Sequence, residues 1–159
     1  MLKEIRLKNP DEYNLILGQS HFIKTVEDIS ELIMNTNPTA EFGLAFSEAS
    51  GPCLIRTEGN NDNLIDLAVE NLKNIRSGHS FILFMKNVFP INFLPGLKSI
   101  PEIANIFCAT ANPVSVIVYE SGQGNGVMGV IDGKAPEGVE GSEDKKQRRE
   151  FLRKIGYKF

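Results

Sequence analysis

Ser80–Phe89 reads SFILFMKNVF, and the rest of the architecture can be built outward from this continuous apolar run. An apolar run of this length, without polar alternation, is typical of a strand that is covered on both faces. The following PINFLPG, residues 90–96, contains two prolines and a glycine and ends the strand. The sequence therefore predicts a strand with packed elements above and below it.

The residues before this run predict a helix and a hairpin. Residues 61–80, NDNLIDLAVENLKNIRSGHS, place one apolar face on a helix, and Gly78 is expected to end it; the face consists of Leu64, Leu67, Ala68, Leu72 and Ile75. Residues 40–59, AEFGLAFSEASGPCLIRTEG, predict strands near Glu41–Ser47 and Cys53–Thr57 joined by a Gly-Pro turn. A further helix is expected to open at Thr25, with Asp28 in its first turn.

The flanking segments add strands and one more helical pattern. Strands are expected at Leu2–Leu7, Tyr13–Leu17, residues 112–120 (NPVSVIVYE) and residues 126–133 (GVMGVIDG). Residues 97–111, LKSIPEIANIFCATA, have a helix-like pattern in which Pro101 would occupy the first turn or divide two short turns. Strands with helices between some of them and hairpins elsewhere predict an α/β (mixed α+β) fold with a mixed β-sheet and packed helices.

Length and composition favour one globular domain. The 159 residues contain no internal repeat and no linker, so we expect a single compact domain over residues 1–159. No apolar stretch is long enough to span a bilayer, and the first residues lack the apolar core of a signal peptide. Cys53 and Cys108 lack metal-ligand spacing and are expected to be reduced thiols, which points to the cytoplasm. His21 and His79 lie far apart in the sequence, so no metal site is expected from the protein alone.

Charge is concentrated at the C-terminus. The last fifteen residues, KKQRREFLRKIGYKF, carry seven Lys or Arg and one Glu, a net charge of +6, which leaves −9 for residues 1–144 because the chain sums to −3. Phe151, Leu152 and Ile155 recur at helical spacing and predict a helix that docks on the body, in its core or in a subunit contact. A docked basic helix is a better reading than a nucleic-acid-binding tail, because no basic groove or aromatic string accompanies it.

A glycine-rich run, Glu120–Lys134 (ESGQGNGVMGVIDGK), raises the question of phosphate binding. The run lacks the spacing of a P-loop and leads into a strand rather than a helix, so neither a P-loop nor a dinucleotide fold is expected. The local pattern is that of a β-hairpin, with Asn125-Gly126 suited to a tight turn.

Polar residues collect at the expected strand ends and loops, where sites on rigid sheets are commonly built. We take these as candidates for one site: Ser47, Glu48, Ser50, Arg56, Asn92, Thr110, Asn112, Glu120 and Asp132. Each has a plainer explanation as a turn residue or a surface ion pair, such as Arg56 with Glu58. A Cys53–His79 nucleophile pair ranks lower, because a structural cysteine is more common in such a segment.

Five blocks in order resemble the small archaeal and bacterial adenosine-specific kinase family: AEFGLAFSEASGPCLIRTEGN, GHSFILFMKNVFPINFL, IFCATANPVSVIVYE, GVIDGKAPEGVE and REFLRKIGYKF. The resemblance covers essentially the whole chain. It implies a compact α/β protomer, a homotrimer, binding of adenosine or AMP, and ATP-dependent phosphorylation of adenosine. One departure is Asn125, where the family is expected to carry an arginine. Phosphate binding would then be weaker, or another group such as Arg56, Arg148 or Arg149 would supply the contact.

The resemblance suggests roles for the candidate residues. Asp132 or Glu48 would orient a ribose hydroxyl or hold Mg²⁺, while Arg56 and Lys134 would face phosphates. Amides of Gly122, Gly124 and Gly126 would form an anion nest, and Asn92 and Asn112 would read the adenine edge. ATP and Mg²⁺ are expected if the protein is a kinase. The alternative is an adenine-nucleotide-binding protein without turnover, because no established phosphoryl-transfer motif is present; a membrane partner is not expected and nucleic acid is disfavoured.

Overall fold

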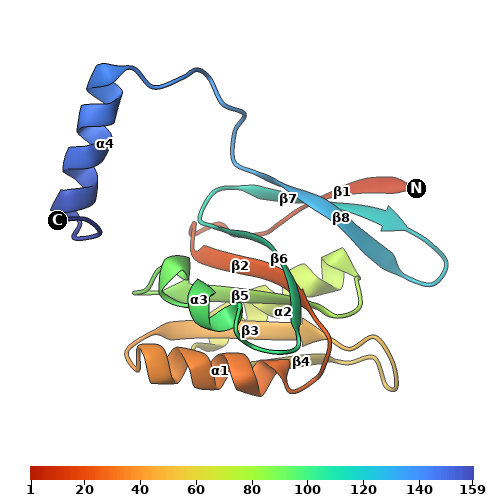
Figure 1. Ribbon diagram of the computed structural model, residues 1–159. Coiled ribbons are helices and arrows are strands. Elements are labelled where there is room, and N and C mark those ends of the chain that lie inside the picture. Colours follow the sequence, from red (N-terminus) through yellow and green to blue (C-terminus); the bar gives the residue numbers. More distant parts are fainter.

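The run that begins at Ser80 forms the central strand of a five-stranded antiparallel sheet in the computed structural model, which describes residues 1–159. β5 (Ser80–Lys86) lies between β3 (Glu41–Ser47) and β2 (Asn14–Ser20), and β4 (Ile55–Gly59) and β6 (Ile103–Thr110) form the two edges (Figure 1). Every residue of β5 from Ser80 to Met85 is buried. The expectation of a strand covered on both faces is confirmed.

A second, three-stranded sheet packs against the first. It consists of β1 (Leu2–Arg6), β7 (Val114–Glu120) and β8 (Asn125–Asp132), in the order β1-β7-β8. Val114, Val116 and Val118 of β7 pack onto β2 and β5 of the large sheet. The α/β class is confirmed, but the strands form two antiparallel sheets instead of one mixed sheet, because every neighbouring pair in both sheets is antiparallel.

Helices cover the large sheet on both faces. α1 (Thr25–Thr36) and α3 (Leu94–Leu97) share one apolar cluster with Ile16, Leu44 and Leu83, and η1 (Pro90–Asn92) lies next to α3. α2 (Asp62–Ile75) and the small sheet share the cluster on the other face. Figure 1 shows these layers, with α1 and β8 on opposite sides of the large sheet. None of the helices has the length and apolar character that a membrane span requires.

α2 is fixed at both ends. Its N-cap Asn61 accepts a hydrogen bond from the Leu64 N–H at 3.1 Å, and neighbouring Asn60 bonds to the backbone of Ala40 and Phe42.

The prediction that α2 ends at Gly78 is wrong. Arg76 ends the helix in the left-handed conformation (φ 55°), and Gly78 is instead needed where this segment meets the β3–β4 loop, since an added Cβ would lie 2.8 Å from that of Ala49.

The helix-like reading of residues 97–111 is also wrong. Only Leu94–Leu97 is helical, and from Ile103 onward the chain is the edge strand β6. Pro101 disfavours helix in the residue before it, and β2 offers an open hydrogen-bonding edge that β6 occupies, with Leu17 opposite Cys108. Pairing in the tertiary structure therefore overrides the local periodicity.

The expected docking of the C-terminal helix on the body is not seen within one chain. α4 (Ser142–Lys154) begins at the predicted place, but none of its residues is buried. Figure 1 shows it standing apart from both sheets at the end of an extended linker. Its apolar stripe consequently faces solvent in a single chain.

A buried carboxyl group lies between α1 and the start of β6. Glu102 is only 5% exposed, and neither of its carboxylate oxygens has a hydrogen-bond partner, although Lys24 Nζ lies 3.3 Å from Oε2. Burial, and secondarily the nearby Asp28 carboxyl, raises the pKa of Glu102 above its ordinary value. The folded protein therefore holds this proton more tightly than the unfolded chain does.

This difference predicts a pH dependence of stability. As the pH rises above about 4.3, the ordinary pKa of a glutamate, Glu102 must lose its proton at a growing cost in the folded state, so its contribution to the free energy of unfolding falls. We expect Glu102→Gln, which stays uncharged, to gain stability relative to the wild type as the pH rises, measured by urea unfolding between pH 4.5 and 8. Glu31→Gln on the exposed face of α1 is the control; curves for Glu102→Gln and wild type that run parallel would contradict the assignment.

Candidate functional site

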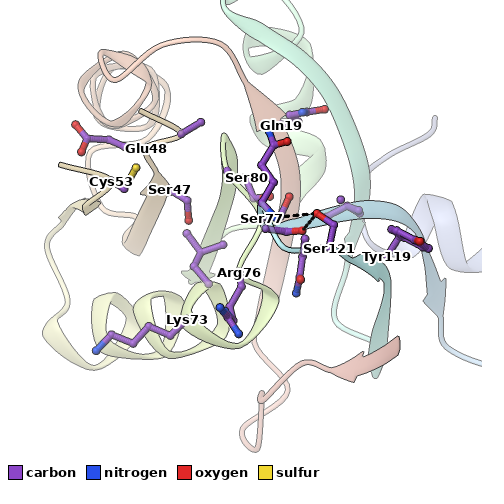
Figure 2. Close-up of a pocket in the computed structure, with 18 of the residues that line it drawn as sticks. Gln19, Ser47, Glu48, Cys53, Lys73, Arg76, Ser77, Ser80, Tyr119 and Ser121 are labelled. Atoms are coloured by element: carbon purple, nitrogen blue, oxygen red, sulfur yellow. Dashed lines mark hydrogen bonds between the residues drawn. The ribbon is translucent and has the colours of Figure 1, made fainter. Parts of the chain in front are cut away.

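The main cavity of the protein, of about 990 Å³, lies where three segments from distant parts of the chain meet. They are the C-terminal end of α2, the β3–β4 loop and the β7–β8 hairpin, and β2 and β5 close the cavity at its base (Figure 2). The polar side chains that line it are Gln19, Ser47, Glu48, Lys73, Arg76, Ser77, Ser80, Tyr119, Ser121, Gln123 and Asn125. A cavity of this size, walled by elements of a rigid sheet, is large enough for a small organic ligand.

The hairpin and the end of α2 are tied together by Asn125. Its Nδ2 donates to the Ile75 carbonyl at 2.8 Å, and its backbone N–H donates to the Arg76 carbonyl at 3.1 Å. These bonds satisfy carbonyls that the last turn of a helix leaves free. Asn125, the departure noted in the sequence, therefore holds two walls of the cavity together.

The glycine-rich run is a hairpin, as its local pattern predicts, but its turn is not at Asn125-Gly126. The turn spans Ser121–Gly124, where both the N–H and the hydroxyl of Ser121 donate to the Gly124 carbonyl and Gly124 has a φ of 151° that favours glycine. Asn125 and Gly126 already belong to β8. The N–H groups of Gly122 and Gly124 find no acceptor in the chain, so they can donate to a ligand.

Glu48 supplies the cavity with a fixed negative charge. One carboxylate oxygen accepts from the Leu54 N–H at 2.8 Å, and the other accepts from Nε and Nη2 of Arg56 at 3.0 and 2.8 Å. The Leu54 amide, followed by the Arg56 guanidinium, lowers the pKa of Glu48. Glu48 is therefore ionised at neutral pH and held in one orientation, and Arg56 is committed to it and not to Glu58.

Two cations stand at the opposite wall. Lys73 and Arg76 both come from the end of α2, and neither forms an ion pair within the chain. Figure 2 shows them on the α2 side of the cavity, across from Glu48. An anionic group of a ligand would therefore find uncommitted positive charge at this wall.

The structure brings together only some of the residues expected at the site. Ser47, Glu48, Gly124 and Gly126 line the cavity, while Gly122 lies in the adjoining turn and Ser50 at the exposed tip of the β3–β4 loop. Glu120 pairs with Lys3, and Asn92 accepts a hydrogen bond from the Phe89 N–H at η1. Asn112 and Asp132 contact one another (3.3 Å) at the far end of β7 and β8, and Lys134 follows them. Thr110 lies near them, where its hydroxyl accepts from the Asn112 N–H.

Sequence reasoning missed the residues at the base and on the α2 wall. Gln19 is exposed although it belongs to an internal strand, where it pairs with Ser80 of β5 and Asn105 of β6. A glutamine that follows the apolar run Leu15–Leu17 was a usable signal, and so were the basic residues Lys73 and Arg76 at the end of an amphipathic helix. Their convergence was not predictable without the pairing of the strands.

The two cysteines differ in their surroundings, and both are free. Cys108 is buried, and burial raises the pKa of its thiol to about 11, so it stays protonated. Cys53 is exposed at the wall of the cavity and adopts a φ of 50°.

Comparison with known proteins gives a family and a structural relative. The family model described as "Adenosine specific kinase" matches residues 5–158. The crystal structure of the PH1918 protein from Pyrococcus horikoshii OT3 is similar over 100% of this chain and 98% of that chain, with 41% sequence identity and a TM-score of 0.94. The search of curated proteins gave no match.

Proposed function

The chain belongs to the adenosine-specific kinase family, and on this premise we propose that its main cavity binds adenosine or AMP. The observation that carries the proposal is the pairing of a fixed carboxylate, Glu48, with uncommitted cations, Lys73 and Arg76, across one cavity. This arrangement suits a ligand that is neutral and hydroxyl-rich at one end and anionic at the other.

Each part of adenosine monophosphate has a chemical partner in the cavity. The Gln19 carboxamide at the base offers a donor and an acceptor for the adenine edge, and the Phe107 ring, which also lines the cavity, offers apolar surface. Glu48 and Ser47 would accept hydrogen bonds from ribose hydroxyls. Lys73, Arg76 and the free amides of the Ser121–Gly124 turn would receive the phosphate.

We propose phosphorylation of adenosine by ATP as the reaction. The O5′ oxygen of adenosine would form a bond to the γ-phosphorus while the bond from that phosphorus to the β,γ-bridging oxygen breaks. ADP leaves, and the O5′ proton passes to water. Glu48 is a weak base because of its lowered pKa, so its role would be to orient the hydroxyl. It is also the only carboxylate lining the cavity, and both of its oxygens already accept hydrogen bonds, so Mg²⁺ would be held by the ATP phosphates.

A coupled assay of ADP release tests the reaction. We expect ADP formation from ATP and Mg²⁺ that depends on added adenosine, with AMP as the second product. Binding of adenosine without adenosine-dependent ADP release would remove the phosphoryl-transfer part of the proposal and leave a binding protein, the alternative function.

Membership of this family also suggests an oligomeric state. We propose that the protein is a homotrimer, which the molar mass in solution tests. A single chain of 17.6 kDa in solution would contradict it.

Arg76→Gln should separate nucleotide from nucleoside binding. A charge-assisted hydrogen bond contributes about 1.5–3 kcal/mol, so we expect the Kd for AMP to rise by roughly 10- to 100-fold while the Kd for adenosine changes little. Isothermal titration calorimetry with both ligands measures this, and Lys98→Gln, far from the cavity on the end of α3, is the control. An equal rise in the Kd for adenosine and for AMP would show that Arg76 does not face the phosphate.

A further inference from the structure

Two apolar surfaces of the chain have no partner, and the first is on α4. Phe151 is 58% exposed, and Ile155, Tyr157 and Phe159 are exposed with it. Phe151 and Ile155 lie four residues apart and share one stripe of α4, and the chain folds back after the helix so that the Tyr157 N–H donates to the Leu152 carbonyl. A helix with this stripe is unstable in water unless the stripe packs against something.

The second surface is the side of the small sheet that faces away from the large one. Strand register places Leu2 opposite Tyr119, Ile117 opposite Gly129 and Ser115 opposite Ile131, all on this side. Tyr119 and Ile131 are about half exposed (51% and 50%), and an added Cβ at Gly129 would meet nothing within 4 Å. We call this surface the outer face of the small sheet; no element of its own chain covers it (Figure 1).

We infer that α4 of one copy packs on the outer face of the small sheet of a second copy. Both surfaces expose apolar side chains, with Glu4 and Arg6 of β1 at one edge of the outer face, and each chain carries one of each surface. A head-to-tail exchange therefore fills every surface when the assembly closes into a ring. Residues 133–141, between β8 and α4, can reach roughly 30 Å when extended, which is enough to cross to a neighbouring molecule.

Charge favours a second copy as the occupant. Residues 142–159, which contain α4, have seven Lys or Arg and three Asp or Glu, a net charge of +4, and residues 1–132 have nine against fifteen, a net charge of −6. The helix of one chain is therefore attracted to the body of another. Tyr119 belongs both to the outer face and to the cavity lining, so a helix seated there borders the cavity of its neighbour. The inference does not depend on adenosine binding, and it gives the proposed trimer a specific interface.

The first test removes the stripe without removing the helix. We expect Phe151→Asp/Ile155→Asp to reduce the molar mass measured by light scattering to the 17.6 kDa of a single chain. The control is Lys146→Gln/Arg153→Gln, which lowers the charge of α4 by the same two units on the face opposite the stripe and should keep the assembled mass. An assembled mass that survives the loss of the stripe would overturn this interface while leaving the trimer and adenosine binding in place.

The second test asks which chain holds the helix. In a Cys53→Ser background, Phe151→Cys with Ile131→Cys should give, after oxidation, disulfide-linked multimers on a denaturing gel, while the pair Phe151→Cys with Thr36→Cys should not. Cross-linked species that run as single chains would show that α4 folds back on its own sheet, and no cross-link at all would place α4 elsewhere; either result overturns the inference.

Discussion

Gln19→Trp is expected to abolish adenosine binding without unfolding the protein. Gln19 is exposed only because the cavity opens above it, since its strand is paired on both sides. An indole at this position would occupy the volume assigned to the base, and we expect the Kd for adenosine to rise by more than about 100-fold, or ~2.7 kcal/mol. Isothermal titration calorimetry measures the loss, and AMP should be lost in parallel.

Two controls make this result specific to the cavity. Thr36→Trp adds the same side chain at the exposed end of α1, on the opposite face of the large sheet, and should leave binding unchanged. The midpoint of thermal unfolding of Gln19→Trp should stay close to that of the wild type. Adenosine binding of wild-type strength in a folded Gln19→Trp protein would place the ligand outside this cavity.

Gly43→Ala is expected to destabilise the protein by about 3 kcal/mol or more. A Cβ on Gly43 would lie 2.2 Å from the backbone N of Ile65 and 2.2 Å from the backbone C of Leu64. These are main-chain atoms in the first turns of α2, so no side-chain rotation relieves the overlap. The free energy of unfolding in urea measures the effect.

Gly138→Ala is the control for this substitution. Gly138 lies in the linker between β8 and α4, where an added Cβ meets nothing within 4 Å and its φ is not positive, so we expect a change of less than about 0.5 kcal/mol. Equal stability of Gly43→Ala and wild type would show that α2 does not sit directly on β3. Since α2 carries Lys73 and Arg76 at its other end, any Gly43→Ala protein that still folds should also bind AMP more weakly.

Much of the fold could be predicted from the sequence at places where the local hydrophobic pattern agrees with the burial of the element in the tertiary structure. The buried run at Ser80–Phe89 and the amphipathic pattern of α2 each specify one structure, because burial and periodicity point the same way. Residues 97–111 failed because an edge strand that is buried unevenly mimics helical spacing, and only pairing with β2 distinguishes the two.

The candidate site was predictable only in part. Ser47, Glu48, Gly124 and Gly126 could be found because they sit at strand ends and in a hairpin next to them. The sequence also made Asp132 a candidate for this site, although it lies at the end of β8 that is remote from the cavity. Only the direction in which β8 runs shows this, and the sequence does not give that direction. Gln19 of β2 and Arg76 at the end of α2 come together because α2 packs on the face of the sheet that carries Leu15, Leu17 and Gln19. These residues are far apart in the chain, so the sequence alone does not show that they meet.

The crystal structure of the protein with adenosine tests the central claim most directly. The account predicts the nucleoside in the cavity between α2 and the β7–β8 hairpin, with its base within hydrogen-bond distance of Gln19 and its ribose facing Glu48. Adenosine bound at any other place on the molecule, or an empty cavity in crystals grown at saturating adenosine, would contradict it.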